Sequence, residues 1–210
     1  MYECLVKSQD LDIVQAALNF LFTLFLNRKD YAKAQEYLNQ IPGWSFNEER
    51  FQATLYRKQG NIQEAYECHE KLIFNGYADI SWALQGIYVM AMEEGDFEKA
   101  RWIVGKQKSL AHLLEMGLYM EASPEWDLAV TNKDKDKALD ILAEMVYGVK
   151  SIDAYKDSRL YCHMKFEKND SDGIALMLKK AFENDTSIQF LKEDSRYQEL
   201  MRELEGYENL

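Results

Sequence analysis

Two cysteine–histidine pairs are the residues of this chain whose types could carry chemistry, because thiolates and imidazoles ligate metals and serve as nucleophile and base. They are Cys68–His69 and Cys162–His163. Consecutive residues of a helix point about 100° apart, so an adjacent pair does not readily share a metal ion. His69 also falls on the apolar stripe of its segment, together with Ile62 and Ala65. We therefore expect packed histidines at both places, and neither a metal ion nor another cofactor.

Catalysis would need a nucleophile within reach of a base, or carboxylates held in a cleft, and no recognised spacing in the 210 residues supplies either. The alternating Lys and Asp of residues 133–137 compensate one another and are typical of a solvated turn. We therefore expect a binding protein and not an enzyme. An enzyme with an unrecognised site would reveal itself by turnover of a small substrate.

A short sequence motif recurs along the chain, and it predicts the helices that position the chain's side chains. Its copies are residues 29–34, 60–65, 95–100 and, more weakly, 133–138. In each copy an Asp or Asn precedes a helical stretch and can cap its free amides. In the copies at 60–65 and 95–100 a Gly stands before the cap and can close the preceding helix in a left-handed conformation. The Ala that ends each copy is small enough for a neighbouring helix to pack on it. These alanines lie 31, 35 and 38 residues apart, and periods of this size mark stacked two-helix repeats.

Helical periodicity and breaking residues then predict where the elements begin and end. Three hairpins are expected, with Asn75–Gly76 ending the second, and their helices cover residues 10–27 with 31–41, 47–59 with 62–75, and 79–94 with 97–106. Less regular elements follow: a helix over 108–121, one that begins at Ser123–Pro124, one over 137–146, an irregular stretch to residue 166, a helix over 173–184 and a terminal capping helix over 190–200. We expect one domain over residues 1–210, with regular hairpins over 1–107 and irregular helices over 108–210.

These hairpins resemble the tetratricopeptide repeat family. The residues that carry the resemblance are Gly60, Ala65 and Leu72, or Gly95, Ala100 and Val104, for the second helix, and Leu18, Leu21 and Phe25 for the first. The resemblance covers residues 11–107 and implies an all-α fold, a superhelical stack of helix hairpins with a concave groove. Stacks of this kind bind peptides and proteins.

The family's groove, carried over position by position, falls on Asn19, Thr23, Arg50, Thr54, Arg57, Trp82, Gln85 and Val89. This mixture suits a peptide, because amides can bond an extended backbone and Arg can hold a carboxylate with two hydrogen bonds. Trp adds a broad contact surface. The resemblance therefore predicts a peptide-binding groove anchored by Arg50, Arg57 and Trp82. The alternative is that these side chains are merely solvated.

Two segments of the C-terminal half carry a second resemblance, residues 160–166 and residues 190–197. Both are similar to the end of bacterial regulators in which an Xre-type helix-turn-helix domain precedes a tetratricopeptide-like region. The resemblance implies that this chain is the ligand-sensing and dimerising part of a transcriptional regulator, with the DNA reader ahead of Met1. The alternative is a free-standing scaffold that assembles other proteins, and the reading frame upstream of Met1 separates the two.

Composition limits the partners. The net charge is −11, from 25 basic and 36 acidic residues, so the surface repels phosphate backbones and anionic headgroups. The apolar stretch from Ala16 to Leu26 falls well short of the roughly 20 residues that span a bilayer. Three cysteines without a Cys-x-x-Cys pair indicate a reducing compartment, and the first residues lack a signal-peptide pattern. We expect a cytoplasmic protein that contacts neither nucleic acid nor membrane, binds a peptide or protein, and can form a homodimer.

Overall fold

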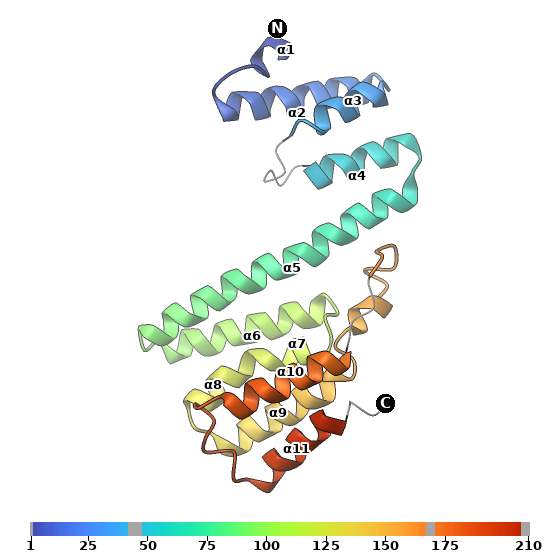
Figure 1. Ribbon diagram of the computed structural model, residues 1–210. Coiled ribbons are helices and arrows are strands. Elements are labelled where there is room, and N and C mark those ends of the chain that lie inside the picture. The colour runs from blue at the N-terminus through green and yellow to red at the C-terminus, as the bar shows by residue number, and fades with distance from the viewer. Residues whose placement is uncertain (1, 42–47, 167–170, 207–210) are drawn as a thin grey trace. The chain divides into compact units, whose positions relative to one another are not determined.

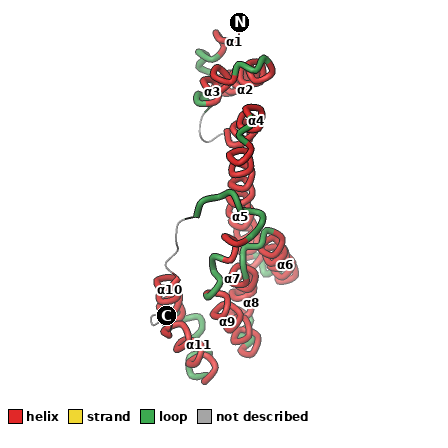
Figure 2. The backbone as a smooth tube through the Cα atoms, turned by 90° about the vertical axis from the view of Figure 1, so that its right-hand side faces the viewer, coloured by secondary structure: helices red, strands yellow, loops and turns green. Residues whose placement is uncertain are grey.

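The computed structural model describes residues 2–41, 48–166 and 171–206, and all regular elements within these ranges are helical (Figure 2). The expected all-α class is therefore confirmed. The chain divides into two compact units: unit 1 is residues 1–75 with 163–165, and unit 2 is residues 76–162 with 166–210. Among the described helices, none combines the length and the apolar character that crossing a membrane requires.

Unit 1 begins with a short α1 (Tyr2–Leu5) and a helix hairpin, α2 (Leu11–Asn27) and α3 (Tyr31–Leu38), whose helices lie side by side (Figure 1). After α4 (Glu48–Gln59) comes the first part of α5 (Ile62–Glu93). The carboxylate of Asp10 caps α2, accepting from the amides of Asp12 and Ile13. The expected helix over 10–27 is confirmed, and its apolar stripe forms the core of unit 1 with α3 and α4: Leu18, Leu21, Phe22, Phe25, Leu38 and Leu55.

The repeated sequence motif forms the same turn between helices at all four of its copies. The residue before each cap has a positive φ: 60° at Lys29, 86° at Gly60, 73° at Gly95 and 52° at Lys133. At three copies an Asp carboxylate accepts a hydrogen bond from the amide three residues on, at 3.3, 3.0 and 3.2 Å. The final alanines are buried, with exposed fractions of 0, 5, 0 and 0%. The predicted turn is thus confirmed, and the two lysines adopt the left-handed conformation despite a steric cost of roughly 1 to 2 kcal/mol.

The predicted break at Asn75–Gly76 is wrong, because α5 runs without interruption from Ile62 to Glu93. The segments expected over 62–75 and 79–94 are therefore one helix. A glycine inside a helix costs only about 1 kcal/mol relative to alanine. Gly76 does not take the positive φ of a helix end, and no proline follows to stop the helix.

Unit 2 contains the rest of α5, which lies beside α6 (Phe97–Leu113) (Figure 1). The other elements are α7 (Leu118–Ala122), the 3-10 turn η1 (Ser123–Glu125), α8 (Trp126–Thr131), α9 (Lys135–Val149), the 3-10 turn η2 (Ala154–Asp157), α10 (Ser171–Asn184) and α11 (Ser195–Gly206). The expected helix end near 106 is wrong, since α6 continues to Leu113. Pro124 lies in the first turn of η1, as expected, but Ser123 makes no side-chain cap.

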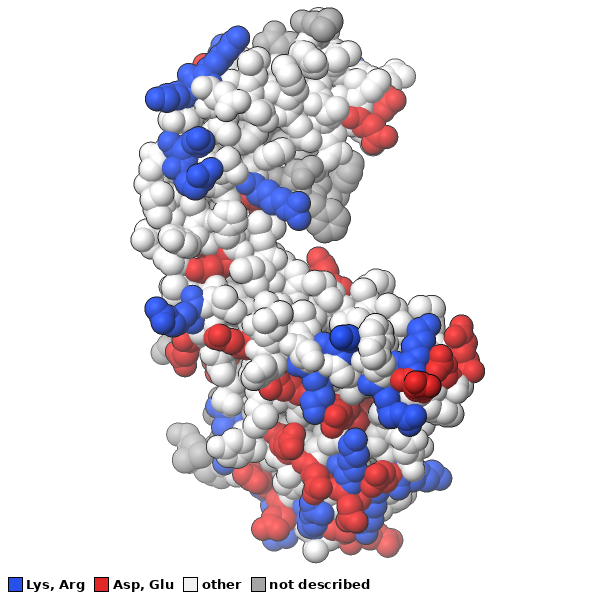
Figure 3. Space-filling view, turned by 180° about the vertical axis from the view of Figure 1, so that it is seen from behind, with Lys and Arg blue, Asp and Glu red and all other residues white. Residues whose placement is uncertain are grey.

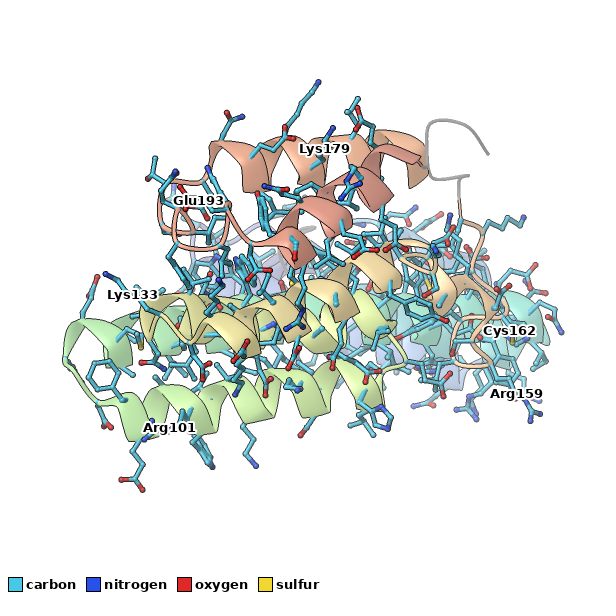
Figure 4. The ribbon with its side chains drawn as sticks, turned by 90° about the horizontal axis from the view of Figure 1, so that it is seen from below. Arg101, Lys133, Arg159, Cys162, Lys179 and Glu193 are labelled. Carbon is cyan, nitrogen blue, oxygen red and sulfur yellow. The ribbon has the colours of Figure 1, made fainter. Side chains whose placement is uncertain are left out.

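The core of unit 2 is built around α9, which packs against α7, α8, α10 and α11. Its buried side chains include Leu139, Leu142, Met145 and Val146. Near its end, Gly148 allows a very close approach of α7, because a Cβ at this position would lie 2.6 Å from the backbone nitrogen of Tyr119. Charged side chains occupy the outside: Arg101 and Lys133 are both exposed, and in Figure 4 they project from α6 and from the turn before α9.

The terminal helix α11 begins at Ser195, later than the predicted start at residue 190. Asp194 precedes it and accepts a hydrogen bond from the amide of Arg196 at 2.9 Å. The Lys135 ammonium, 2.7 Å away, holds the pKa of Asp194 below its ordinary value, and the Arg196 amide acts in the same direction. Arg196 in turn pairs with Asp140 of α9. These contacts join the start of α11 to the first two turns of α9.

Candidate functional site

A pocket of about 410 Å³ opens in unit 2 between α5, α6 and the segment from α7 to α8. Its lining residues come from these elements in turn: Tyr77, Ser81, Trp82 and Gln85 from α5, Gln107 from α6, and Met120, Ser123, Pro124 and Asp127 from the last segment. Most of them carry a hydroxyl, an amide or a carboxylate. The pocket is therefore a hydrogen-bonding site that also offers two aromatic side chains, Tyr77 and Trp82.

Local sequence places these side chains on the pocket. Residues 77, 81 and 85 recur every fourth position, so they lie along one face of α5. Pro124 is the second residue of η1, the short turn that connects α7 to α8. The close contact of α7 with Gly148 of α9 fixes the position of that segment. The wall opposite α5 is thus held by the core of unit 2.

Two glutamines form an amide pair at the pocket. Nε2 of Gln107 donates a hydrogen bond to Oε1 of Gln85 at 3.0 Å. Gln107 is only 8% exposed, and within the described part of the chain its Oε1 has no hydrogen-bond donor. A buried acceptor left without a donor costs about 1 to 3 kcal/mol. A ligand that donates a hydrogen bond here would recover that free energy.

Asp127 is the only acidic or basic residue among the described residues that line the pocket. Its side chain keeps part of its surface in solvent, but the protein atoms around the carboxylate still raise its pKa by burial, and the negative charge of Asp185 adds to the rise. No described residue donates a hydrogen bond to this carboxylate. Trp82 is 82% exposed. The pocket thus combines an uncompensated negative charge with a free aromatic surface.

Of the predicted groove residues, Trp82 and Gln85 line this pocket. Val89, one helical turn beyond Gln85, is exposed and lies outside the lining. The binding role of the three residues stays a prediction. Gln107 and Asp127 were missed, because their segments lie outside the first helices of the repeats from which the groove was assigned.

The other predicted residues lie in unit 1. Asn19 and Thr23 are on α2, where the Thr23 hydroxyl donates to the carbonyl of Asn19 at 2.9 Å. On α4 the Thr54 hydroxyl donates in the same way to the carbonyl of Arg50, again at 2.9 Å. Both hydroxyls thus bond to their own helix. Arg50 is exposed, and it does not line the pocket around Cys68 or the pocket around His69.

Arg57 lines a second pocket, of about 260 Å³, together with Ile62, Ala65, Tyr66 and His69. The expectation of a packed His69 is wrong, because the side chain is exposed. On the same stripe Ala65 is buried whereas Ile62 and Tyr66 are exposed, so the protein covers the stripe only in part. A binding role for Arg57 stays a prediction.

His163, by contrast, is packed as expected, and its partner is a buried carboxylate. Glu70, 6% exposed, accepts hydrogen bonds from the backbone amides of His163 and Met164, at 2.8 and 3.0 Å. The Nδ1 atom of His163 lies 2.5 Å from Oε1 of Glu70, and the ring of Tyr66 stacks on the imidazole with centroids 4.6 Å apart. Carboxylate and imidazole are both metal-ligand types. Here they bond to each other and fasten residues 163–165 to α5.

Cys68 is not an activated nucleophile. Burial raises the pKa of its thiol, and the positive charge of Lys71 only partly opposes the rise. A reactive thiolate needs a lowered pKa and an electropositive surrounding. The thiol of Cys68 therefore stays protonated at neutral pH.

No protein-family model matches the chain, and neither a curated protein nor a solved structure matches it. Both family resemblances consequently remain predictions. The geometry and charge of the unit 2 pocket are what supports a functional assignment.

Proposed function

We propose that the chain is a helical peptide-binding module whose unit 2 pocket binds an extended segment of a peptide or protein ligand. The observation that carries the proposal is the Gln85–Gln107 amide pair, with one buried acceptor free, beside the exposed ring of Trp82. An extended peptide presents backbone N–H and C=O groups that side-chain amides can bond. Aromatic side chains supply much of the binding energy in such interfaces.

The dimensions of the pocket are consistent with this function. Its volume of about 410 Å³ falls within the roughly 300 to 1,000 Å³ that ligand sites usually have. Five elements of unit 2 contribute to the wall: α5, α6, α7, η1 and α8. A site shared by several packed helices is held in shape by the core, which lowers the entropy lost when a ligand binds.

The proposal also includes a more specific fold and a biological role. The capped turns with buried alanines support helix hairpins of the tetratricopeptide type in a superhelical stack, with the continuous α5 joining the second hairpin to the third as a departure from that pattern. The resemblance of residues 160–166 and 190–197 supports a role as the sensing and dimerising part of a bacterial transcriptional regulator. Sequencing the gene upstream of Met1 tests this role. A reading frame without a helix-turn-helix domain would favour the scaffold alternative.

Peptide binding is tested by panning a phage library of random dodecapeptides on the whole chain. Enriched peptides are then titrated calorimetrically against Trp82→Ala and against Trp102→Ala, a matched control at an exposed tryptophan of α6 outside the pocket. We expect at least a tenfold loss of affinity for Trp82→Ala and none for Trp102→Ala. Equal affinity for both variants would move the site away from this pocket, and a library without enrichment would contradict the proposal as a whole.

A further inference from the structure

The negative charge of the chain is concentrated in unit 2. That unit has 26 acidic and 16 basic residues, a net charge of −10, whereas unit 1 has 10 and 9, a net charge of −1. Acidic side chains are spread among basic ones over the face of unit 2 that occupies the lower part of Figure 3. A surface of this sign raises the local concentration of cations and speeds their association.

The individual atoms that line the pocket also favour a cation. The Asp127 carboxylate is negative, the Oε1 of Gln107 lacks a donor, and among the described residues of the lining there is no Lys or Arg. The cationic ends of Lys and Arg are donors only and have no acceptor atom. They therefore match a site whose unused polar atoms are acceptors.

Trp82 supplies the third element of a cation site. The face of an indole attracts a cation placed within about 6 Å of the ring centre. Unit 2 already uses this contact on α6, where Nζ of Lys106 lies 5.3 Å from the ring centre of Trp102. Trp82 is more exposed than Trp102, and no Lys or Arg of the described chain lies over its ring.

We infer that the pocket of unit 2 takes the cationic end of a Lys or Arg side chain from an extended basic peptide, an inference that rests on the proposed peptide-binding function. Asp127 pairs with the cation, Trp82 covers it with its ring, and Oε1 of Gln107 accepts one of its N–H groups. A carboxylate in the same place would meet Asp127 without a basic residue to pair with. This pocket therefore selects the opposite charge to the one predicted for the Arg50 and Arg57 anchors.

The electrostatics of Asp127 agree with this occupant. Burial and the charge of Asp185 both raise the pKa of Asp127, so the carboxylate is held where its ionised form is disfavoured. A cation in the pocket would offset both effects. Carboxylates in this condition are characteristic of functional sites.

The test uses three pentapeptides that are acetylated and amidated, so that only the central side chain can carry charge. Gly-Ala-Lys-Ala-Gly, its norleucine analogue and its glutamate analogue are titrated to millimolar concentration into the isotope-labelled chain. Binding is followed by NMR at the indole N–H of Trp82, which is assigned from Trp82→Phe. The lysine peptide is repeated with Asp127→Asn and with Asp157→Asn, a control at an exposed acid outside the pocket.

We expect the lysine peptide to bind at least tenfold tighter than the norleucine peptide, and the glutamate peptide to bind weakest. Asp127→Asn should abolish the preference for lysine, and Asp157→Asn should leave it unchanged. Equal binding of the lysine and norleucine peptides would overturn the cation inference and leave the proposed function standing. As a cation without a peptide backbone, n-butylammonium is titrated in the same way. If it bound as tightly as the lysine peptide, the pocket would be a cation site to which the peptide backbone contributes nothing, and the proposed peptide-binding function would fail. No response of Trp82 to any probe would overturn both.

Discussion

Replacing Gly148 by alanine tests the packing that holds the wall of the pocket. Here α7 approaches the end of α9 so closely that an added Cβ would lie 2.6 Å from the nitrogen of Tyr119, 2.9 Å from its Cα and 3.2 Å from the carbonyl carbon of Leu118. Ordinary contacts of a Cβ lie at 3.4 to 4 Å. All three neighbours are backbone atoms, so no side chain can rotate away. The methyl group therefore fits only if α7 and α9 move apart by roughly 1 Å.

Two effects of opposite sign decide how much Gly148→Ala changes the free energy of unfolding. Alanine favours the helix over glycine by about 1 kcal/mol. Overpacking of a core costs about 1 to 3 kcal/mol, and backbone on the facing side places this case at the upper end. The net loss should be about 1 to 2 kcal/mol, which lowers the melting temperature by roughly 2 to 8 °C for a chain of this size. Because α7 carries Met120 and leads into Ser123, affinity for a pocket ligand should fall as well.

The assay is thermal and urea unfolding followed by far-ultraviolet circular dichroism, with Gly105→Ala as the matched control. Gly105 lies inside α6, and a Cβ there would meet nothing within 4 Å. The control should therefore be stabilised by up to about 1 kcal/mol through helix propensity alone. If Gly148→Ala were stabilised as much as Gly105→Ala, the close approach of α7 to α9 would be refuted.

Three further substitutions test other parts of the structure. Gly76→Ala should raise the helix content and stabilise the chain by up to about 1 kcal/mol, because the position is inside α5 with open space around it; destabilisation would indicate a helix end there. Ala100→Trp should destabilise by about 1 to 3 kcal/mol, since this alanine is 0% exposed, whereas Ala83→Trp on the exposed face of α5 should cost far less in the same urea titration. Burial raises the pKa of Asp127, so the folded chain holds this proton more tightly than the unfolded chain, and ionisation opposes folding. Asp127→Asn should accordingly melt above the parent at about pH 7, and the difference should shrink as the pH falls toward about 4; a difference that grows in acid would contradict the argument.

The helix turns could be predicted because their causes are local. Asp30, Asp96 and Asp134 bond to amides three residues away, and the left-handed residue stands immediately before each of them. Such contacts need no distant partner, so the pattern of residue types suffices. The burial of the alanines could be predicted from the same sequence motif, because their distance from the capping residue determines on which face of the helix they lie.

Helix ends without such a signal were predicted less well. Asn75–Gly76 has the composition of a turn, and Lys108 follows a weakening of the apolar pattern, but α5 and α6 pass through both. Helix propensities differ by about 1 kcal/mol or less at such positions. Packing along the rest of a long helix easily exceeds that difference, so the outcome depends on the neighbours.

The pocket and the buried carboxylate were decided by tertiary structure. Gln85 and Gln107 are 22 residues apart and meet because α5 and α6 fold back on each other. Glu70 and His163 are 93 residues apart, and no sequence pattern indicates that they pair. The residue pattern alone therefore establishes an all-helical chain with capped, alanine-packed hairpins and an acidic surface, because periodicity, capping and charge are properties of short segments. Which polar atoms share a pocket, and which of them lack a partner, depends on contacts between segments far apart in the chain, and only the folded structure brings those segments together.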